Sequence, residues 1–204
     1  KQLTKTGQAP ILLTPEQEKA VCGMEALLQK REPAVALLHG VTGSGKTLCY
    51  LRLIDRVKQE GGGVIVLVPE IVLTPQLTDR FFGRYGKQVA VLHSGLSAGE
   101  RRDEWRRIRR GECPIVVGTR SAVFAPVANL RLIVIDEEQE YAYKSESTPR
   151  YHARTIAKYR AAQCNALLLL CSATPSVESY AAAQQGRYHL FELGSRYTDL
   201  GLPK

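Results

Sequence analysis

Short apolar runs recur along the chain, and each is four to six residues long and rich in Val, Ile and Leu. Runs of this length without polar alternation are typical of strands buried on both faces of a parallel sheet. We therefore predict a strand at each run. The runs are Val35–His39, Val64–Val68, Val89–Leu92, Ile115–Gly118, Leu132–Asp136 and Leu167–Ser172.

The segments between these runs carry helix signals. Segment 14–29 begins with a threonine suited to cap a helix, and Pro15 follows at the first helical position. Ser97 and Glu100 have the spacing of a capping box, which predicts a second helix that ends at about Arg110. Because strands alternate with helices, the sequence predicts a three-layer α/β domain with a central, mostly parallel sheet.

The chain shows no internal repeat and no low-complexity linker within its body. Gly61–Gly63 follows a helix that we expect to end near Gln59, so a tight turn into the next strand is predicted there. We assign residues 13–193 to one lobe. Residues 1–12 and 194–204 have little periodicity, and we interpret them as linkers, the second leading toward a missing second lobe of a longer protein.

Composition narrows the function classes. The formal net charge of +8 favours polyanionic partners such as nucleic acid. None of the five cysteines forms a C-x-x-C pair, so we expect no zinc in this fragment. No apolar stretch is long enough to span a membrane, and the first residues lack a signal core, so we expect no membrane contact and a cytoplasmic location.

Gly40–Thr47 matches the P-loop pattern G-x-x-x-x-G-K-[ST] between an apolar strand and a helix. Glycines let the backbone wind around an anion, so that successive N–H groups and the helix N-terminus face the phosphates of ATP. Lys46 is expected to reach the β and γ oxygens, and Thr47 to offer its hydroxyl to Mg²⁺. The alternative is a glycine-rich turn that binds nothing. The cofactor-binding residues predicted here are Gly40, Thr42, Gly43, Ser44, Gly45, Lys46 and Thr47.

An apolar strand ends in the acidic sequence Asp136-Glu137-Glu138-Gln139. In a P-loop protein, a carboxylate at this position holds the Mg²⁺ shell, and an adjacent Glu orients or deprotonates the attacking water. We assign Asp136 to the metal and Glu137 to the base. An acidic strand end can also be a solvated turn, and the P-loop upstream is what favours catalysis. The two motifs are predicted to meet across one magnesium-nucleotide pocket.

The P-loop, the acidic motif and Ser172-Ala173-Thr174 together resemble the first RecA-like lobe of superfamily 2 helicases. Further blocks make the chain similar to the replication-restart helicases of the primosome over roughly residues 12–193. The resemblance implies an ATP-dependent helicase that moves 3′→5′ on single-stranded and forked DNA, with other primosome proteins and single-stranded-DNA-binding protein as partners. The further blocks are Val68–Gln76, Leu92–Ser97, Gly118–Pro126 and Pro149–Arg154.

The resemblance also implies residue roles. Gln17 matches the position that contacts adenine, although it can also be an ordinary polar residue of a first helical turn. The implied DNA contacts are Thr74, Gln76, Thr119, Arg120, Tyr141, Tyr143 and Lys144. Backbone and hydroxyl groups at strand ends suit phosphates, and tyrosine faces suit bases. For Arg120 a structural ion pair is the alternative, and Tyr151 with His152 can instead begin a helix.

Gln139 stands where the family usually has His. An amide cannot carry a proton at neutral pH, but it can hydrogen-bond the Ser172–Thr174 turn. We count Gln139 with Lys46, Asp136 and Glu137 among the catalytic residues. Ser172 and Thr174 are the implied coupling residues between the ATP site and DNA.

Arg101–Arg110 contains six arginines, yet Asp103 and Glu104 lie at helical spacing from several of them. We therefore interpret this run as a solvated helix face, with Trp105 and Ile108 as its buried stripe.

Three function classes remain. The favoured one is the ATP-binding lobe of a helicase motor, of the replication-restart type or of another superfamily 2 branch. A second is a module that binds single-stranded nucleic acid and uses ATP only as a switch. A third, a small-molecule kinase, lacks an evident place for a lid. Because a motor of this kind needs a second lobe to supply an arginine finger, we expect residues 1–204 alone to hydrolyse ATP slowly.

Overall fold

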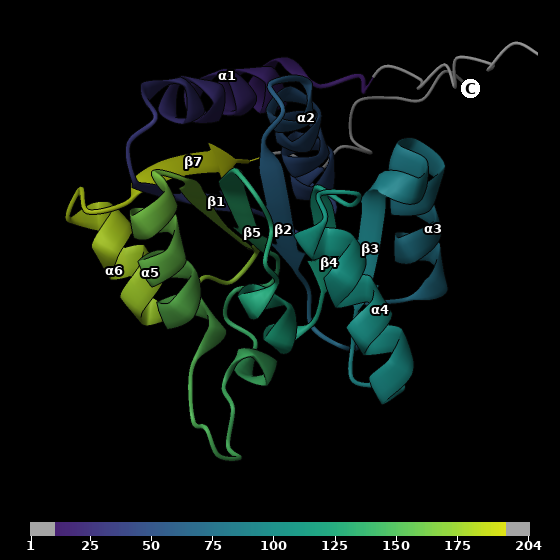
Figure 1. Cartoon of the computed structure of the whole chain (residues 1–204). Helices are drawn as coiled ribbons and strands as arrows, with labels where there is room; N and C mark the ends of the chain where they lie inside the picture. Colours follow the sequence, from purple (N-terminus) through teal and green to yellow (C-terminus); the bar gives the residue numbers. More distant parts are fainter. Residues whose placement is uncertain (1–10, 195–204) are drawn as a thin grey trace, which may run out of the picture.

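Seven strands, all paired in parallel, form one sheet in the computed structural model, which describes residues 11–194. Their spatial order is β3-β4-β2-β5-β6-β1-β7 (Figure 1). Both predicted linkers fall almost wholly outside the described residues, and the lobe boundaries stay a prediction. The strands are β1 (Ala34–Gly40), β2 (Gly63–Leu67), β3 (Val89–Leu92), β4 (Ile115–Gly118), β5 (Leu130–Ile135), β6 (Leu167–Ser172) and β7 (His189–Leu193).

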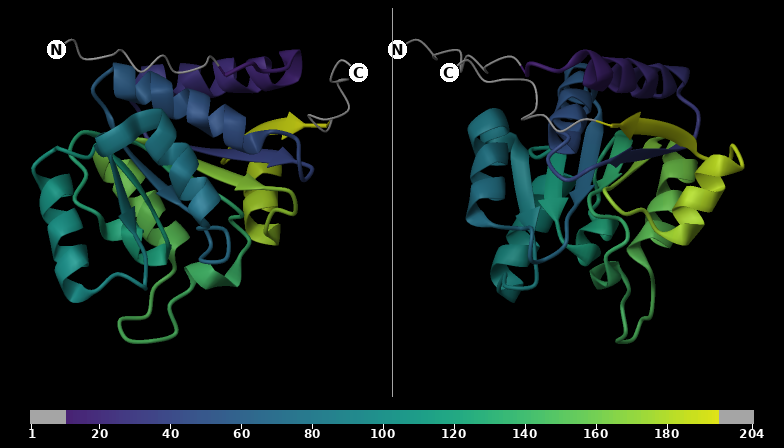
Figure 2. Two further views of the ribbon diagram at one scale, coloured as in Figure 1. Left: turned by 90° about the vertical axis from the view of Figure 1, so that its right-hand side faces the viewer. Right: turned by 180° about the vertical axis from the view of Figure 1, so that it is seen from behind.

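Helices cover both faces of this sheet, and the layers are visible in the two further views (Figure 2). One face carries α1 (Pro15–Lys30), α2 (Lys46–Gln59) and α3 (Pro75–Tyr85). The other face carries α4 (Ala98–Arg109), α5 (Ala153–Cys164) and α6 (Val177–Gln184). Short 3₁₀ turns lie at η1 (Gly86–Gln88), η2 (Arg120–Phe124) and η3 (Tyr141–Tyr143). The predicted three-layer α/β architecture is confirmed.

The core explains why the strands read as continuous apolar runs. Leu38 and Val66 pack under α1, α2 and α3, whereas their neighbours Leu37 and Ile65 pack under the helices of the opposite face. Successive side chains of a strand point to opposite faces, and here both faces are covered. Every residue of β2, β4, β5 and β6 is accordingly buried.

Helix boundaries follow the predicted caps. The Thr14 hydroxyl accepts from Gln17 N and the Gln17 side chain accepts from Thr14 N, which makes a complete capping box at α1. Ser97 and Glu100 form the same reciprocal pair at α4. The predicted start signals are therefore confirmed. Each one satisfies N–H groups that the first helical turn leaves without partners.

Three features differ from the sequence prediction. Strand β5 begins two residues earlier than predicted and contains Arg131, whose guanidinium donates to Leu28 O at 2.6 Å and so tolerates burial. Strand β7 was not predicted, because exposed His189 and Glu192 interrupt its apolar residues. In the predicted stripe of α4, Ile108 is buried but Trp105 is only partly covered.

The topology brings the sequence motifs to one edge. Because all strand pairs are parallel, the carboxyl ends of the strands lie together, and ligands of open α/β sheets bind there. The P-loop follows β1 and the acidic turn follows β5, with only β6 between them in the sheet. The chain between η3 and α5 projects from the body as the long green loop of Figure 1.

Candidate nucleotide and nucleic-acid sites

The P-loop is built around two left-handed glycines. Gly43 and Gly45 have φ values of 83° and 84°, a region that a side chain disfavours, and a Cβ on Gly43 would meet open space. Gly45 caps α2, so the free N–H groups of the first turn face the loop. The Lys46 ammonium donates to Gly40 O at 2.7 Å, folded back on the loop that it would leave for a phosphate.

A cavity of about 470 Å³ lies beside this loop, and its opposite wall contains the acidic turn. Lys46 and Asp136 therefore line the same hollow, together with Glu137. Arg80 of α3 also reaches this cavity, and no sequence motif indicated it. The lining residues are Thr42, Gly43, Gly45, Lys46, Thr47, Leu48, Arg80, Asp136 and Glu137.

Asp136 is a buried carboxylate in an unfavourable setting. Burial, followed by the charge of neighbouring Glu137, raises the pKa of Asp136 to about 6. Tyr50 donates its hydroxyl to Asp136 Oδ2 at 3.3 Å, and Glu137 N donates to Asp136 Oδ1 at 3.1 Å, but these bonds and Lys46 offset only part of the effect. A cation in the cavity would relieve the repulsion between the two carboxylates.

Glu137 adopts a left-handed backbone with φ of 48°. Such strain in a residue with a side chain is typical of functional sites. Gln139 Nε2 donates to Glu137 Oε2 at 3.0 Å, while Ser172 Oγ donates to Gln139 Oε1 at 2.6 Å. Thr174 N in turn donates to Ser172 Oγ at 2.9 Å. Gln139 thus makes the contact with the Ser172 turn that the sequence predicted.

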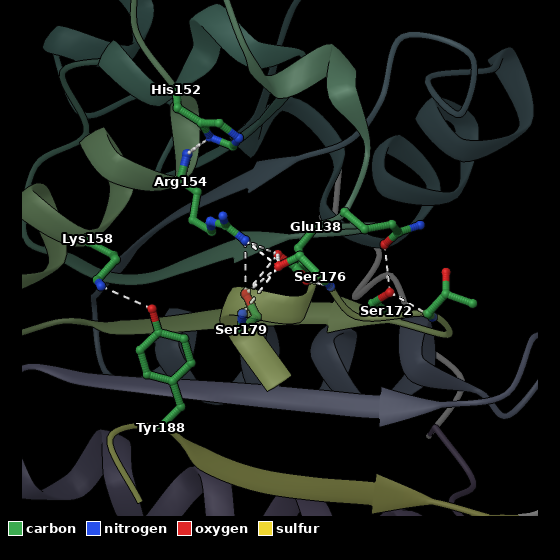
Figure 3. Close-up of polar contacts among 10 residues, drawn as sticks. Glu138, His152, Arg154, Lys158, Ser172, Ser176, Ser179 and Tyr188 are labelled. Carbon is green, nitrogen blue, oxygen red and sulfur yellow. Dashed lines mark hydrogen bonds and ion pairs between the residues drawn. The ribbon is translucent and has the colours of Figure 1, made fainter. Parts of the chain in front are cut away.

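Glu138 is a structural member of the site that sequence reasoning missed. Its side chain has no exposed area, and Glu138 Oε2 pairs with Arg154 Nη1 at 2.6 Å (Figure 3). Glu138 Oε1 accepts from Ser176 N at 2.7 Å, and the Ser179 hydroxyl donates to Glu138 Oε2 at 3.0 Å. The acidic turn, α5 and α6 are therefore tied together at one buried carboxylate. No local pattern signals this, because the partners lie 16 to 41 residues away.

Gln17 lies against the P-loop rather than open to the cavity. Gln17 Nε2 donates to Ser44 O at 2.8 Å, and Gln17 Oε1 accepts from Thr14 N at 2.9 Å. Both ends of the amide are engaged and the residue is buried. A contact with adenine would require exchange of at least one of these bonds, so that role stays a prediction.

The residues predicted to follow DNA lie at the ends of β2 and β4. Thr74 caps α3, and Gln76, two residues further on, is exposed. Arg120 donates to Lys144 O at 2.5 Å and stands 5.8 Å over the Tyr151 ring, so it bridges the strand end and the long loop. A hollow of about 260 Å³ lies here. Its lining is Val68, Pro69, Glu70, Ser94, Thr119, Arg120, Ser121, Ala142 and Tyr143.

The prediction for Tyr143 is corrected by the structure. Its ring is 1% exposed, and its hydroxyl donates to the carbonyls of Leu67 and Asp136, so it packs in the core and cannot stack on a base. Burial raises its pKa. Tyr141 is 62% exposed with Lys144 Nζ 5.4 Å from its ring, so these two side chains remain accessible. His152 caps α5, which fits the interpretation of this segment as a helix start.

The family follows from comparison with known proteins. Residues 14–183 match the model of the DEAD/DEAH box helicase family. The chain belongs to the DEAD/DEAH box helicase family. The match spans the P-loop and the acidic turn, which line the same cavity, and the Ser172 segment, which contacts the acidic turn through Gln139.

Individual relatives of this DEAD/DEAH box helicase chain are replication restart proteins. It is 53% identical over 195 residues to replication restart protein PriA of Bacillus subtilis, and 48% identical over 201 residues to that of Synechocystis. Each alignment covers 96% of this chain and 24% of the relative, so the chain spans about a quarter of their length. The resemblance to replication-restart helicases is confirmed.

A solved structure shares the fold. RecG bound to a three-way DNA junction matches with a TM-score of 0.67 and 24% identity, covering 92% of this chain and 24% of that one. The Hef helicase domain of Pyrococcus furiosus matches with a TM-score of 0.60 and 20% identity. The RecA-like architecture of the lobe is thus shared with helicases of distant sequence.

The site suits Mg²⁺ carried with a nucleotide. Among residues 11–194, no cluster of three or more His, Cys, Asp or Glu could hold a metal by itself. Mg²⁺ is usually bound through one or two carboxylates together with substrate phosphates and waters. The buried Asp136 carboxylate, which lines the same cavity as Thr47, fits that requirement. Within the same residues, no helix has the length and apolar character needed to cross a membrane.

Proposed function

We propose that this chain is the ATP-binding lobe of an ATP-dependent helicase that moves 3′→5′ on single-stranded DNA during replication restart. The observation that carries the proposal is the cavity that the P-loop and the acidic turn line together. The relatives named replication restart protein PriA support the process. Single-stranded and forked DNA, other primosome proteins and single-stranded-DNA-binding protein are the proposed partners, in the cytoplasm.

Each residue has a defined task in the proposed reaction. The P-loop N–H groups and Lys46 hold the β and γ phosphates. Thr47 and Asp136 would hold Mg²⁺, which would neutralise charge on the phosphate oxygens. Glu137 aligns the attacking water for in-line displacement. The strained backbone at Glu137 and its bond from Gln139 fix the direction of that carboxylate.

Coupling to DNA is proposed through the chain of bonds that leaves Glu137. Gln139 links Glu137 to Ser172, and Ser172 accepts from Thr174 N. On the DNA side, Arg120 is bonded to the loop that carries Tyr141 and Lys144. Phosphates are expected on Thr74, Gln76, Thr119 and Arg120, and bases on Tyr141. If DNA binding shifts the long loop, Arg120 should move with it. The shift should also reach the acidic turn, because Arg154 at the end of this loop is paired with Glu138.

The test is Glu137→Gln in the chain extended to the length of its relatives. The amide keeps the shape of the side chain but cannot accept a proton, so DNA-stimulated ATP hydrolysis should fall by about 10²- to 10⁴-fold while nucleotide binding persists. Glu140→Gln is the matched control, because Glu140 is exposed three residues away. Unchanged turnover in Glu137→Gln would contradict the motor and favour a module that uses ATP only as a switch.

A further inference from the structure

A third hollow, of about 650 Å³, lies at the start of α4 and outside the cavity beside the P-loop. Two aromatic rings and two guanidinium groups line it. Phe124 is 43% exposed, and Trp105 is only partly covered. The residues that carry the argument are His93, Arg101, Arg102, Trp105, Ser121 and Phe124. We call this set the α4 pocket.

The charge of the α4 pocket is positive and available. No carboxylate is among its lining residues. Arg101 has no ionic partner in the part of the chain that the structure describes. Arg102 approaches Asp103 at 3.7 Å, but both side chains are 65% exposed, and such surface pairs hold a guanidinium weakly. Both guanidinium groups are therefore free to contact an anion.

The α4 pocket is continuous with the proposed DNA path. Ser121 lines both this pocket and the hollow that contains Thr119 and Arg120. The Phe124 ring lies edge-on to Tyr151 with centroids 5.0 Å apart, and Arg120 stands over the other ring of that pair. A strand whose phosphates follow Thr119 and Arg120 would therefore pass beside the α4 pocket at Ser121.

We propose that the α4 pocket receives an unstacked base of single-stranded DNA. The base lies against Trp105 and Phe124, and Arg101 and Arg102 contact the flanking phosphates. This inference rests on the proposed function, because it extends the same DNA path. Aromatic faces beside cations are the features that bind single strands without reading sequence. An apolar peptide would need no guanidinium pair, so the charge favours DNA.

Trp105 makes the test specific, because it is the sole tryptophan of the chain. Unlabelled oligothymidylate is titrated into the chain while tryptophan emission is recorded, and binding is measured separately by anisotropy of a labelled oligonucleotide. Stacking of a base on Trp105 should quench its emission, and the quenching should saturate at the same concentration as the anisotropy. Phe124→Ala should weaken binding by about 5- to 100-fold, and Phe124→Leu, which preserves the packing on Tyr151, should weaken it as well.

The proposed phosphate contact of Arg101 is tested with two arginine variants of α4. Arg101→Ala should lower the slope of log affinity against log salt by about 0.7, the value for one phosphate contact on a single strand. Arg109→Ala removes an equal charge from α4 outside the pocket lining and should leave both slope and quenching unchanged.

Two outcomes would overturn the proposal in different ways. If the oligonucleotide binds without quenching, and the Phe124 and Arg101 variants bind as the parent does, the α4 pocket is not on the DNA path, although DNA binding by the lobe stands. A protein segment would then be the better occupant. If no oligonucleotide binds at all, the DNA-binding part of the proposed function fails together with the pocket.

Discussion

Asp136 shows how a single residue can lower stability for the sake of a site. Its pKa is raised from 3.8 to about 6 in the folded chain, so the folded state holds the proton more tightly than the unfolded state does. The resulting stabilisation is complete below pH 3.8 and is lost as pH rises through 6. Above that range, the buried charge lowers the free energy of unfolding by about 3 kcal/mol.

Asp136→Asn removes this charge and should raise the free energy of unfolding at pH 7.5 in the absence of Mg²⁺ and nucleotide. The gain should shrink as pH falls through 6 and approach zero near pH 4. Urea denaturation at several pH values measures it. Asp79→Asn, an exposed carboxylate on α3, is the control and should give no such profile. A gain of equal size at pH 4.5 and pH 7.5 would show that burial of Asp136 is not the cause.

At the same scale, one aromatic residue, Tyr143, and one acidic residue, Glu138, show where sequence reasoning fails. Tyr141 and Tyr143 belong to one short segment, yet Tyr141 is exposed and Tyr143 is buried. The buried Tyr143 hydroxyl finds its partners in the carbonyls of Leu67 and Asp136. Glu138 stands among acidic residues that suggest a solvated turn, yet Arg154 encloses it. Both outcomes depend on partners that are distant in sequence, so no local pattern could predict them.

The Glu138–Arg154 pair joins elements, and its strength can be measured. Arg154→Ala leaves a fully buried carboxylate without its ion pair and should lower the free energy of unfolding by about 3–5 kcal/mol. Glu138→Gln in that background removes the unpaired charge and should restore part of the loss. Chemical denaturation of both single variants and the double variant gives the coupling. If Arg154→Ala destabilises no more than Arg109→Ala, the pair does not hold the acidic turn to α5 and α6.

Two glycines, one at a strand end and one within a helix, should respond in opposite ways to replacement by alanine. A Cβ on Gly118, at the end of β4, would lie 2.3 Å from Leu92 O, whereas a Cβ on Gly83 within α3 would meet open space. Gly118→Ala should therefore destabilise the lobe, because backbone must move, while Gly83→Ala should stabilise it by about 0.5–1 kcal/mol. Thermal unfolding of the two variants should shift in opposite directions. Equal shifts would mean that β3 and β4 separate easily at this edge.

The sheet as a whole could be predicted from the sequence better than strand β7 and the position of Arg80. The strands β3, β4 and β6 have the predicted bounds, because each is a nearly unbroken apolar run whose side chains are buried or, at Val91 of β3, partly buried. Strand β7 was not predicted because exposed His189 and Glu192 interrupt its apolar residues, whereas β3, the other edge strand, is apolar throughout. Arg80 was not predicted as a site residue, because its place in the cavity beside the P-loop arises from the packing of α3 and not from a motif.

The molecule as a whole should bind ATP without turning it over at a useful rate. The proposed motor needs an arginine from a second lobe, which contributes about 10³- to 10⁵-fold in other nucleotide hydrolases. Residues 1–204 should therefore show a thermal shift with Mg-ATP that Lys46→Ala abolishes, and DNA-stimulated turnover well below about 1 per second. Arg80 lines the cavity from within this lobe, so it provides the contrary case. Rapid turnover that Arg80→Ala abolishes would show that the lobe carries its own finger and that the two-lobe account is wrong.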